Sequence, residues 1–270
     1  MLAWRLRLLL AVLLIGSAAF GAWVAGAWLG AIALLVALSY AVAALRPGMG
    51  ALVEYGVTGW MYLVAQPFPE AWVPRDPQLA RGEPVLLVHG YFSNRGVWWL
   101  LARRLRAAGY RVHAIDLEPI HAGIDDYAAL LRDRIDAILE LTGGQRVRVV
   151  CHSMGGLAVR AYLRAHGSGK VARLVTLGSP HHGTRHASLG LGQSARQMET
   201  GSAWLRELEA FERGHPLPPT TSIYSVDDNI VSPQDSPVMP DAANVELRGI
   251  GHLSLLCSRR VLAALLVCLL

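Results

Sequence analysis

The stretch Val149–Gly156 reads VVCHSMGG and places Ser153 between an apolar run and two consecutive glycines. The residues before the serine predict a buried strand, and those after it have the spacing of a helix. A serine at such a junction is typical of the sharp turn that raises a nucleophile above a sheet, usually written G-x-S-x-G. In this chain Cys151 stands in place of the first glycine of that pattern. Either Ser153 or Cys151 is therefore the candidate nucleophile.

The turn crowds the residues two positions before and after the serine, so both must be small. Gly155 is small, and Cys151 is unbranched at Cβ. A cysteine nucleophile needs exposure and a neighbour that stabilises its thiolate, whereas Cys151 is the penultimate residue of an apolar strand. We therefore expect Cys151 to pack beneath the turn and Ser153 to be the nucleophile. The alternative is that Ser153 only caps the following helix, a position that serine favours.

On both sides of this stretch, short apolar runs alternate with segments of helical spacing. The expected strands are residues 84–90, 110–117, 146–153, 170–180, 221–226 and 243–250. The expected helices are residues 97–109, 125–142, 155–166 and 253–268, with an irregular and partly helical segment at about 181–219. This alternation predicts an α/β fold, with a mostly parallel central sheet and helices on both faces. Ligands of such sheets bind beyond the carboxyl ends of the strands, where Ser153 is expected.

A serine nucleophile needs a base and an acid that orients the base, in the chain order Ser, Asp or Glu, His for this fold. Of the 10 histidines, only His215 and His252 lie well beyond the fourth strand and the loop that follows it. His252 directly follows a predicted strand, whereas His215 lies in the polar loop RGHPLPP. His252 is therefore the expected base.

The predicted strand 243–250 comes just before His252, and the acid should follow the preceding strand, residues 221–226. Asp227 and Asp228 stand there, and one of them is expected to accept the hydrogen of imidazole Nδ1. A polar turn is the alternative interpretation of this pair. The oxyanion of the reaction needs backbone N–H donors, and we expect those of Met154, directly after the serine, and of Tyr91, after the first strand.

Other histidines lie beside these motifs: His89, His152, His181 and His182. We expect them to shape loops rather than to react, because none occupies the base's place in the chain order. The 3 cysteines lack the spacing of metal ligands and do not settle the redox compartment. We therefore expect neither a catalytic metal nor a cofactor.

The N-terminal part of the chain has a different composition. No charged side chain occurs from Leu8 to Leu45, and as a helix this run would extend roughly 57 Å, nearly twice the thickness of a bilayer's hydrocarbon core. Two transmembrane helices, near 8–25 and 28–45, therefore fit better than one. Arginines flank the run on both sides: Arg5, Arg7 and Arg46. The positive-inside tendency then places both ends of a hairpin in the cytoplasm.

Two alternatives for this run remain open at this point. A single tilted helix would carry the rest of the chain across the membrane. A cleaved signal peptide also begins with basic residues, but its apolar core has only about 7–15 residues. The expected domains are thus a membrane anchor at residues 1–46, a lead-in at 47–83 with a helix near 50–65, and a catalytic domain at 84–270 with a small cap at about 181–219.

The charge pattern argues against nucleic acid as a partner. The net charge is +5, and Lys170 is the only lysine. No run of basic residues is interleaved with aromatic ones, which is the pattern expected of a nucleic-acid surface. We therefore expect no nucleic-acid binding.

Five segments together resemble the bacterial triacylglycerol lipases and esterases of the α/β-hydrolase superfamily, especially the compact ones without a large lid. They are VHG, HSMGG, LVTLGSPHHGT, TSIYSVDDNIV and GIGHLSLL, and the resemblance covers about residues 84–262. In that family the pattern S-I-Y-S-x-x-D-x-I-V carries the acid, which on this sequence selects Asp228 over Asp227. Its members tolerate alanine at the position of Cys151. The hydrophobic N-terminal run is foreign to the secreted lipases.

Motifs and resemblance together predict a serine hydrolase that is anchored in the bacterial inner membrane and cleaves carboxylic esters through an acyl-enzyme. Its expected partners are an ester or lipid substrate and the lipid bilayer. The alternatives are a thioesterase or acyltransferase on the same scaffold, or a catalytically silent module for membrane interaction. Apolar residues of segment 181–219 are expected to line the acyl pocket, although they fit ordinary packing equally well: Leu189, Leu191, Trp204, Leu205 and Leu208.

Overall fold

The computed structural model describes residues 49–73 and 83–270. The chain divides into two compact units, Met1–Val64 and Ala65–Leu270. Helix α3 (Met49–Trp60) lies in the first unit and continues along the chain into the π-helical turn η1 (Met61–Ala65), as the sequence predicts for residues 50–65. The predicted transmembrane hairpin lies outside the described residues. Within the described ranges, no helix combines the length and apolar character needed to cross a bilayer.

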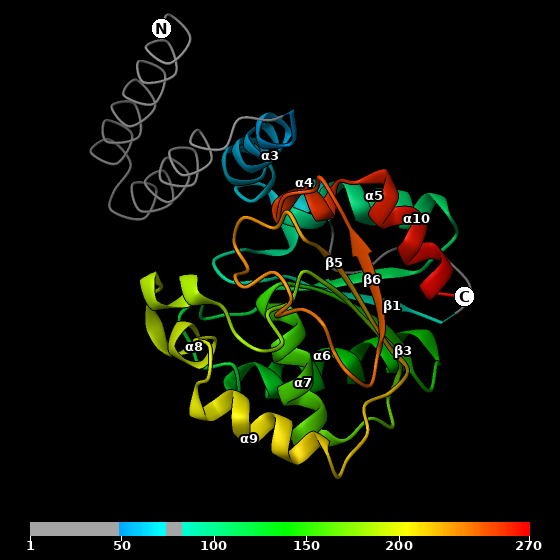
Figure 1. Ribbon diagram of the computed structural model, residues 1–270. Coiled ribbons are helices and arrows are strands. Elements are labelled where there is room, and N and C mark those ends of the chain that lie inside the picture. Colours follow the sequence, from blue (N-terminus) through cyan, green and yellow to red (C-terminus); the bar gives the residue numbers. More distant parts are fainter. Residues whose placement is uncertain (1–48, 74–82) are drawn as a thin grey trace, which may run out of the picture. The chain divides into compact units, whose positions relative to one another are not determined.

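The second unit is built on one sheet of parallel strands in the order β2-β1-β3-β4-β5-β6 (Figure 1). The strands are β1 (Val85–Val88), β2 (Val112–Ile115), β3 (Val147–His152), β4 (Val171–Leu177), β5 (Thr220–Ser225) and β6 (Ala243–Leu247). Each lies within a predicted strand or differs from it by one residue. The chain places β2 on one side of β1 and β3 on the other, so the crevice at the carboxyl ends of β1 and β3 is a topological switch point.

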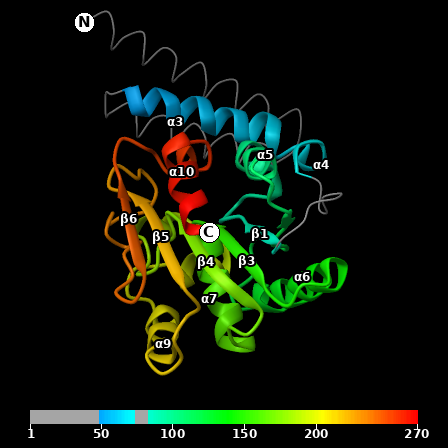
Figure 2. The ribbon, with the colours of Figure 1, turned by 90° about the vertical axis from the view of Figure 1, so that its right-hand side faces the viewer.

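Helices cover both faces of this sheet (Figure 2). One face carries α5 (Trp99–Ala107), which follows the 3-10 turn η2 (Arg95–Trp98), and α10 (Arg259–Cys268). The other carries α6 (Asp126–Thr142), α7 (Met154–His166) and α9 (Ala203–Glu212). Shorter helical pieces are α4 (Pro69–Trp72), η3 (Arg185–Leu189), α8 (Gly192–Gln197) and η4 (Leu253–Leu256). The predicted α/β layering is therefore confirmed.

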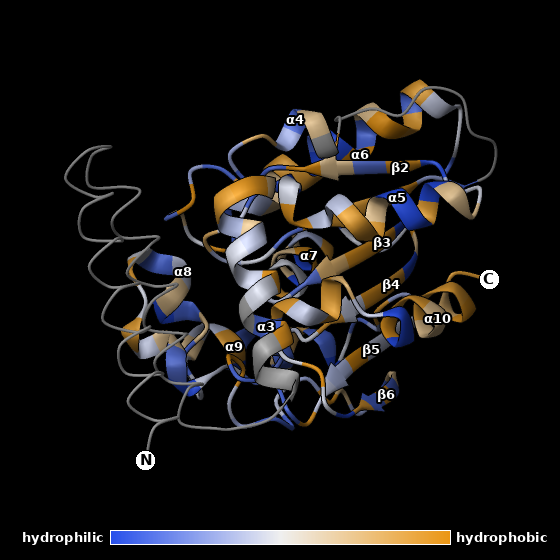
Figure 3. Cartoon of the chain, turned by 90° about the horizontal axis from the view of Figure 1, so that it is seen from above, coloured by the Kyte–Doolittle hydropathy of each residue, from blue (hydrophilic) through white to orange (hydrophobic). Residues whose placement is uncertain are grey.

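Side-chain alternation along the central strands builds the core. Leu86 and Val88 of β1 and Val149 and Cys151 of β3 belong to one buried cluster with the apolar residues of α6, α7 and α9. The apolar colours of the central strands lie between helices whose surfaces alternate in hydropathy (Figure 3). Full burial of each large aliphatic side chain contributes about 1.5–3 kcal/mol. The strand ends thus form a fixed frame for the loops that carry the candidate site.

Candidate active site

Ser153 occupies a strained turn between β3 and α7. Its backbone lies at φ 54° and ψ −130°, a conformation that costs a non-glycine residue about 1–3 kcal/mol. The Ser153 amide still donates to the Leu177 carbonyl at 3.0 Å, so the sheet ladder reaches the serine. A Cβ on Gly155 would lie 2.5 Å from the carbonyl oxygens of both Val88 and His89. The small residue required after the serine is therefore imposed by the end of β1.

Cys151 packs into the core as predicted. Its side chain is fully buried in the cluster between the sheet and α7. Burial raises the pKa of the Cys151 thiol well above its usual value because the thiolate would lose its solvation. A thiol that is both inaccessible and hard to ionise is not a nucleophile. Between the two candidates, only Ser153 faces the carboxyl edge of the sheet.

A buried carboxylate and imidazole meet beside this edge. Asp228 Oδ2 lies 2.7 Å from His252 Nδ1, and both side chains are almost completely buried. The other oxygen, Oδ1, accepts the backbone N–H groups of Ile230 and Val231, each at 2.8 Å. With the carboxylate fixed in this way, Nδ1 of His252 carries the hydrogen and Nε2 is left as the basic nitrogen.

The neighbouring carboxylate points elsewhere. Asp227 Oδ2 accepts the backbone N–H of Gly249 at 2.6 Å, which ties the β5 loop to the loop after β6. Asp228, and not Asp227, is therefore the carboxylate that contacts His252. His215, the other candidate base, is exposed and stacks on Phe211 with ring centroids 4.0 Å apart.

Two side chains hold His252 in place, a role that the sequence did not indicate for either. The Asn229 side chain accepts the backbone N–H of His252 at 3.0 Å. His152 Nε2 donates to the carbonyl oxygen of His252 at 3.1 Å, and the centroids of the two rings are 4.5 Å apart. Burial lowers the pKa of His152 well below 6.5, with a smaller contribution in the same direction from His252. His152 therefore stays neutral against the candidate base.

Glycine is also required where β4 ends. Gly178 lies at φ 57°, and a Cβ there would lie 2.7 Å from Leu255 Cδ1, 3.2 Å from Asp228 Oδ2 and 3.4 Å from His252 Nδ1. The backbone of Gly178 thus forms one wall of the acid–base pair. The signal in the sequence is the glycine of LGSP directly after a strand, which marks a close backbone approach.

The loop after β1 comes close to Ser153. A Cβ on Gly90 would lie 2.7 Å from Ser153 Cβ and 3.3 Å from Ser153 Oγ, so only glycine lets the loop approach so closely. The next amide along this loop is that of Tyr91, the expected oxyanion donor. The second expected donor, Met154, is the first residue of α7, where helix N–H groups have no partner within the helix.

His89 braces this loop, as expected from its position in the chain. Its Nδ1 donates to the Gly90 carbonyl at 2.9 Å, and its Nε2 accepts the N–H of Leu117 at 2.9 Å. Burial lowers the pKa of His89, which keeps the ring neutral and able to accept at Nε2. His89 thus joins the ends of β1 and β2.

The histidines after β4 also form structural contacts. His181 is buried, with Nε2 3.0 Å from Thr176 Oγ1, and its carbonyl accepts Arg160 Nη1 at 3.0 Å. His182 Nδ1 lies 2.8 Å from Glu209 Oε1, and its Nε2 donates to the Val238 carbonyl at 2.9 Å. Both bind the loop after β4 to its neighbours, as the sequence predicts.

The expected apolar lining of segment 181–219 is divided by the structure. Trp204, Leu205 and Leu208 are buried on the face of α9 that covers α7, so they serve ordinary packing. Leu189 and Leu191 are strongly exposed. For the three residues in α9 the structure therefore favours the packing alternative over the acyl pocket, because an amphipathic helix buries its apolar stripe against its nearest neighbour.

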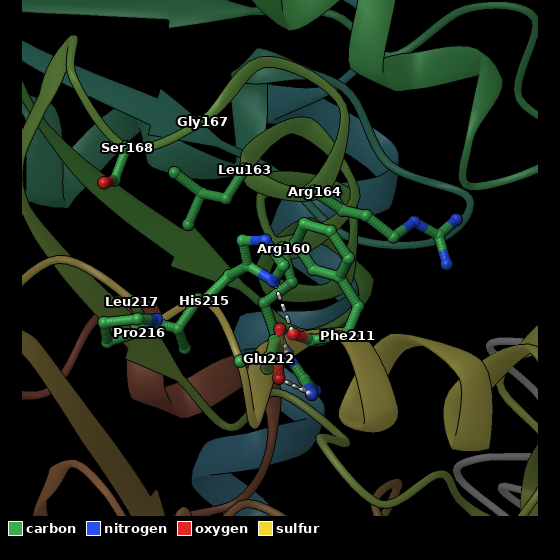
Figure 4. A pocket seen from close by; sticks show the side chains of 11 residues that line it. Arg160, Leu163, Arg164, Gly167, Ser168, Phe211, Glu212, His215, Pro216 and Leu217 are labelled. Atoms are coloured by element: carbon green, nitrogen blue, oxygen red, sulfur yellow. Dashed lines mark hydrogen bonds and ion pairs between the residues drawn. The ribbon is translucent and has the colours of Figure 1, made fainter.

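A cleft of about 310 Å³ lies at the end of α7 opposite Ser153 (Figure 4). Arg160 and Glu212 form a paired contact in it, with Nε to Oε1 at 2.8 Å and Nη2 to Oε2 at 2.6 Å. Phe211 and His215 lie above this ion pair (Figure 4). The cleft is far along the helix from the serine and takes no part in the candidate site.

Comparisons with known proteins agree with this architecture. The family model described as the alpha/beta hydrolase fold matches residues 83–195. A triacylglycerol lipase of Burkholderia plantarii is 31% identical over 125 residues, which is 43% of this chain and 35% of that lipase. Methyl jasmonate esterase 1 of Vitis vinifera is 28% identical over 152 residues, which is 53% of this chain and 56% of that esterase. The chain thus spans only part of the length of the curated relatives that it matches.

Among solved structures, the mature lipase BlEst2 of Bacillus licheniformis superposes with a TM-score of 0.59 at 20% identity. The superposition covers 68% of this chain and 89% of that lipase. The described domain therefore has the α/β-hydrolase fold, and the resemblance to lipases and esterases expected from the sequence is confirmed.

Proposed function

We propose that this α/β-hydrolase domain cleaves carboxylic esters with Ser153 as the nucleophile. The observation that carries the proposal is the buried contact of 2.7 Å between Asp228 Oδ2 and His252 Nδ1, at the sheet edge that also presents the strained Ser153. Similarity to lipases and esterases supports an acyl group as the electrophile.

The residues then have the following roles. His252 Nε2 takes the hydroxyl proton as Ser153 Oγ attacks the acyl carbonyl, and Asp228 stabilises the imidazolium without taking the proton. The amides of Tyr91 and Met154 stabilise the tetrahedral oxyanion. His252 returns the proton to the leaving alcohol, which departs and leaves an acyl-enzyme. Water activated by the same imidazole then attacks the acyl carbon, and the acid is released as Ser153 regains its proton.

A fluorophosphonate probe tests the nucleophile. We expect the wild-type protein to be labelled and the Ser153→Ala variant to show no labelling, because the probe forms a bond to an activated serine oxygen. Cys151→Ala is the matched control at the other candidate position and should label as the wild type does. Equal labelling of wild type and Ser153→Ala would show that the assignment is wrong.

The substrate class is tested with p-nitrophenyl esters of increasing chain length, with an acyl-CoA assayed in parallel. We expect hydrolysis of the esters, with a preference for one range of chain length. Faster turnover of the acyl-CoA would instead favour a thioesterase. Transfer of the acyl group to an added alcohol in place of water would favour an acyltransferase.

We further propose that the chain acts at a membrane. Support comes from the sequence alone, in which no charge interrupts residues Leu8–Leu45. Reporter fusions after Arg46 and at the C-terminus test the expected hairpin, which places both sites in the cytoplasm. Activity of a periplasmic reporter at both sites would overturn this orientation.

A further inference from the structure

Arg95 is a buried cation in the loop after β1. Its side chain is only 4% exposed. The guanidinium forms ion pairs with Asp116, at the end of β2, and with Glu70 of α4. Its Nε donates to the Val73 carbonyl at 3.0 Å, and its own backbone N–H donates to Asp116 Oδ1 at 2.8 Å. A charge in such a position stays buried only when it is paired and hydrogen-bonded on several sides.

The residues next to Arg95 make further contacts with the segment before β1. Asn94 Nδ2 donates to the Gln66 carbonyl at 2.9 Å, and Asn94 Oδ1 accepts the N–H of Gly96 at 2.9 Å. A Cβ on Gly96 would overlap the carbonyl of Ala65. Residues 65–73 therefore pack directly on the loop after β1.

This loop carries the Tyr91 amide in a strained turn. Phe92 lies at φ 50°, a conformation that persists only when the surrounding structure holds it. On the N-terminal side of Phe92, His89 holds the Gly90 carbonyl at 2.9 Å. On the C-terminal side, Arg95 is held by β2 and by residues 65–73. The turn is thus fixed at both ends, and between them lies the Tyr91 amide, directly after Gly90, where an added Cβ would lie 2.7 Å from Ser153 Cβ.

We propose that Arg95 is a positioning residue for the oxyanion hole, acting through the Tyr91 loop and using residues 65–73 as its support. The segment that precedes β1 is then part of the catalytic apparatus. Loss of the contacts between the Arg95 guanidinium and the carboxylates of Asp116 and Glu70 lets the turn at Phe92 relax and moves the Tyr91 amide away from the developing oxyanion. Besides burial, the charge of Arg95 also lowers the pKa of His89 and so opposes the effect of Asp116, which raises it. Arg95 thereby helps to keep the ring of His89 neutral.

This inference rests on the proposed function, so its test uses turnover per active site. The Arg95→Lys variant keeps the positive charge but cannot contact Asp116, Glu70 and Val73 at once. Active sites are counted by complete reaction with a fluorophosphonate, and kcat and KM are then measured with a p-nitrophenyl ester. We expect kcat per labelled site to fall roughly ten- to a hundredfold, with KM changed by less than about threefold, because the oxyanion forms only after binding.

A second variant addresses the support itself. Glu70→Gln removes the charge of a side chain that is 70% exposed, so the fold should tolerate it. We expect a smaller decrease in kcat, and the double variant should lose less than the product of the two single effects, because both act through one contact.

The matched control is Arg160→Lys, which disturbs another buried arginine paired with a carboxylate, remote from the Tyr91 loop. We expect it to lower the melting temperature while kcat per labelled site stays within about twofold of wild type. An Arg95→Lys enzyme with a lowered melting temperature and unchanged kcat per site would overturn the positioning role. Absence of both labelling and hydrolysis in the wild type would instead overturn the proposed function.

Discussion

At position 151 the turn around Ser153 tolerates a side chain larger than the hydrogen of glycine, because that side chain points into the core. Cys151 pairs with Val88 in the β1–β3 register and lies in the cluster beneath α7. The position two residues after the serine has no such space, since the ends of β1 press against Gly155. The two small positions of the pattern are therefore small for different reasons.

Cys151→Ala should keep substantial activity. The change removes one buried sulfur atom, so we expect a loss of about 1 kcal/mol in the free energy of unfolding. Ester hydrolysis per labelled site and urea denaturation measure the two effects. A decrease in kcat as large as that of Ser153→Ala would contradict the packing role.

Asp228→Asn and Asp227→Asn should differ sharply. An amide at 228 cannot fix the Nδ1 hydrogen of His252. Where a serine, a histidine and an aspartate act together in this way, loss of the aspartate's charge lowers kcat by about 10⁴-fold. Asp227 contacts the Gly249 amide and not the imidazole, so Asp227→Asn should change kcat by less than about fivefold. Steady-state kinetics on one ester, side by side, decides between the two carboxylates.

Chain order and local pattern were sufficient to predict Ser153, His252 and the pair Asp227 and Asp228 as candidates, because each lies shortly after a predicted strand. The choice of Asp228 from this pair came from the resemblance to the lipase family. They were insufficient for Asn229 and for the contact between His152 and His252. Those interactions depend on how segments distant in sequence meet, which no local periodicity encodes. The same limit applies to Arg95, because no local pattern in the sequence indicates its contacts with Glu70, Asp116 and Val73.

Among the elements, the first turn of α7 packs against the carboxyl end of β1, and this contact decides the geometry of the turn at Ser153. A helix normally gains about 1 kcal/mol when glycine is replaced by alanine. At Gly155 the new methyl would lie 2.5 Å from two carbonyl oxygens, and relief requires movement of the backbone. The steric cost exceeds the gain in helix propensity.

Gly155→Ala should therefore destabilise the domain by several kcal/mol and abolish labelling of Ser153. Gly214→Ala is a suitable control, because the nearest atom to its added Cβ would be the Phe211 carbonyl oxygen at 3.8 Å. Thermal unfolding and fluorophosphonate labelling are measured for both. Normal labelling of Gly155→Ala at wild-type stability would show that the turn is less crowded than described.

The strands and main helices were predictable because hydrophobic period and glycine punctuation agree over most of the domain. The segment at 181–219 was less so. Its apolar residues predict an amphipathic helix, yet they do not say whether that helix covers a ligand or another helix. In the structure the apolar stripe of α9 faces α7, and only the exposed leucines before it remain available to a substrate.

Over the whole molecule, three buried histidines link stability to pH. Burial lowers the pKa of His89, and lowers those of His152 and His181 well below 6.5. The folded state keeps these rings neutral, whereas the unfolded chain binds protons below about pH 6.5. Their contribution is therefore complete above that pH and decreases as the pH falls toward the folded-state values.

We expect the free energy of unfolding to fall below pH 6.5 by up to about 4 kcal/mol per pH unit, about 1.4 for each histidine. Urea denaturation at a series of pH values gives the slope. His181→Gln should make the slope shallower by about 1.4 kcal/mol per pH unit. An identical slope in wild type and variant would exclude His181 from the effect.

The strand order also determines when the site comes into existence. Ser153 follows β3 near the middle of the sheet, whereas His252 follows the edge strand β6, and His152 meets His252 across 100 positions of the chain. Contacts of such long range form late, because a large loop must close before they yield any stabilisation. A chain still being synthesised, of which only β1 to β4 have left the ribosome, contains Ser153 but not yet His252. The proposed ester cleavage would thus arise only when folding is complete, and we expect a partly synthesised chain to be inactive.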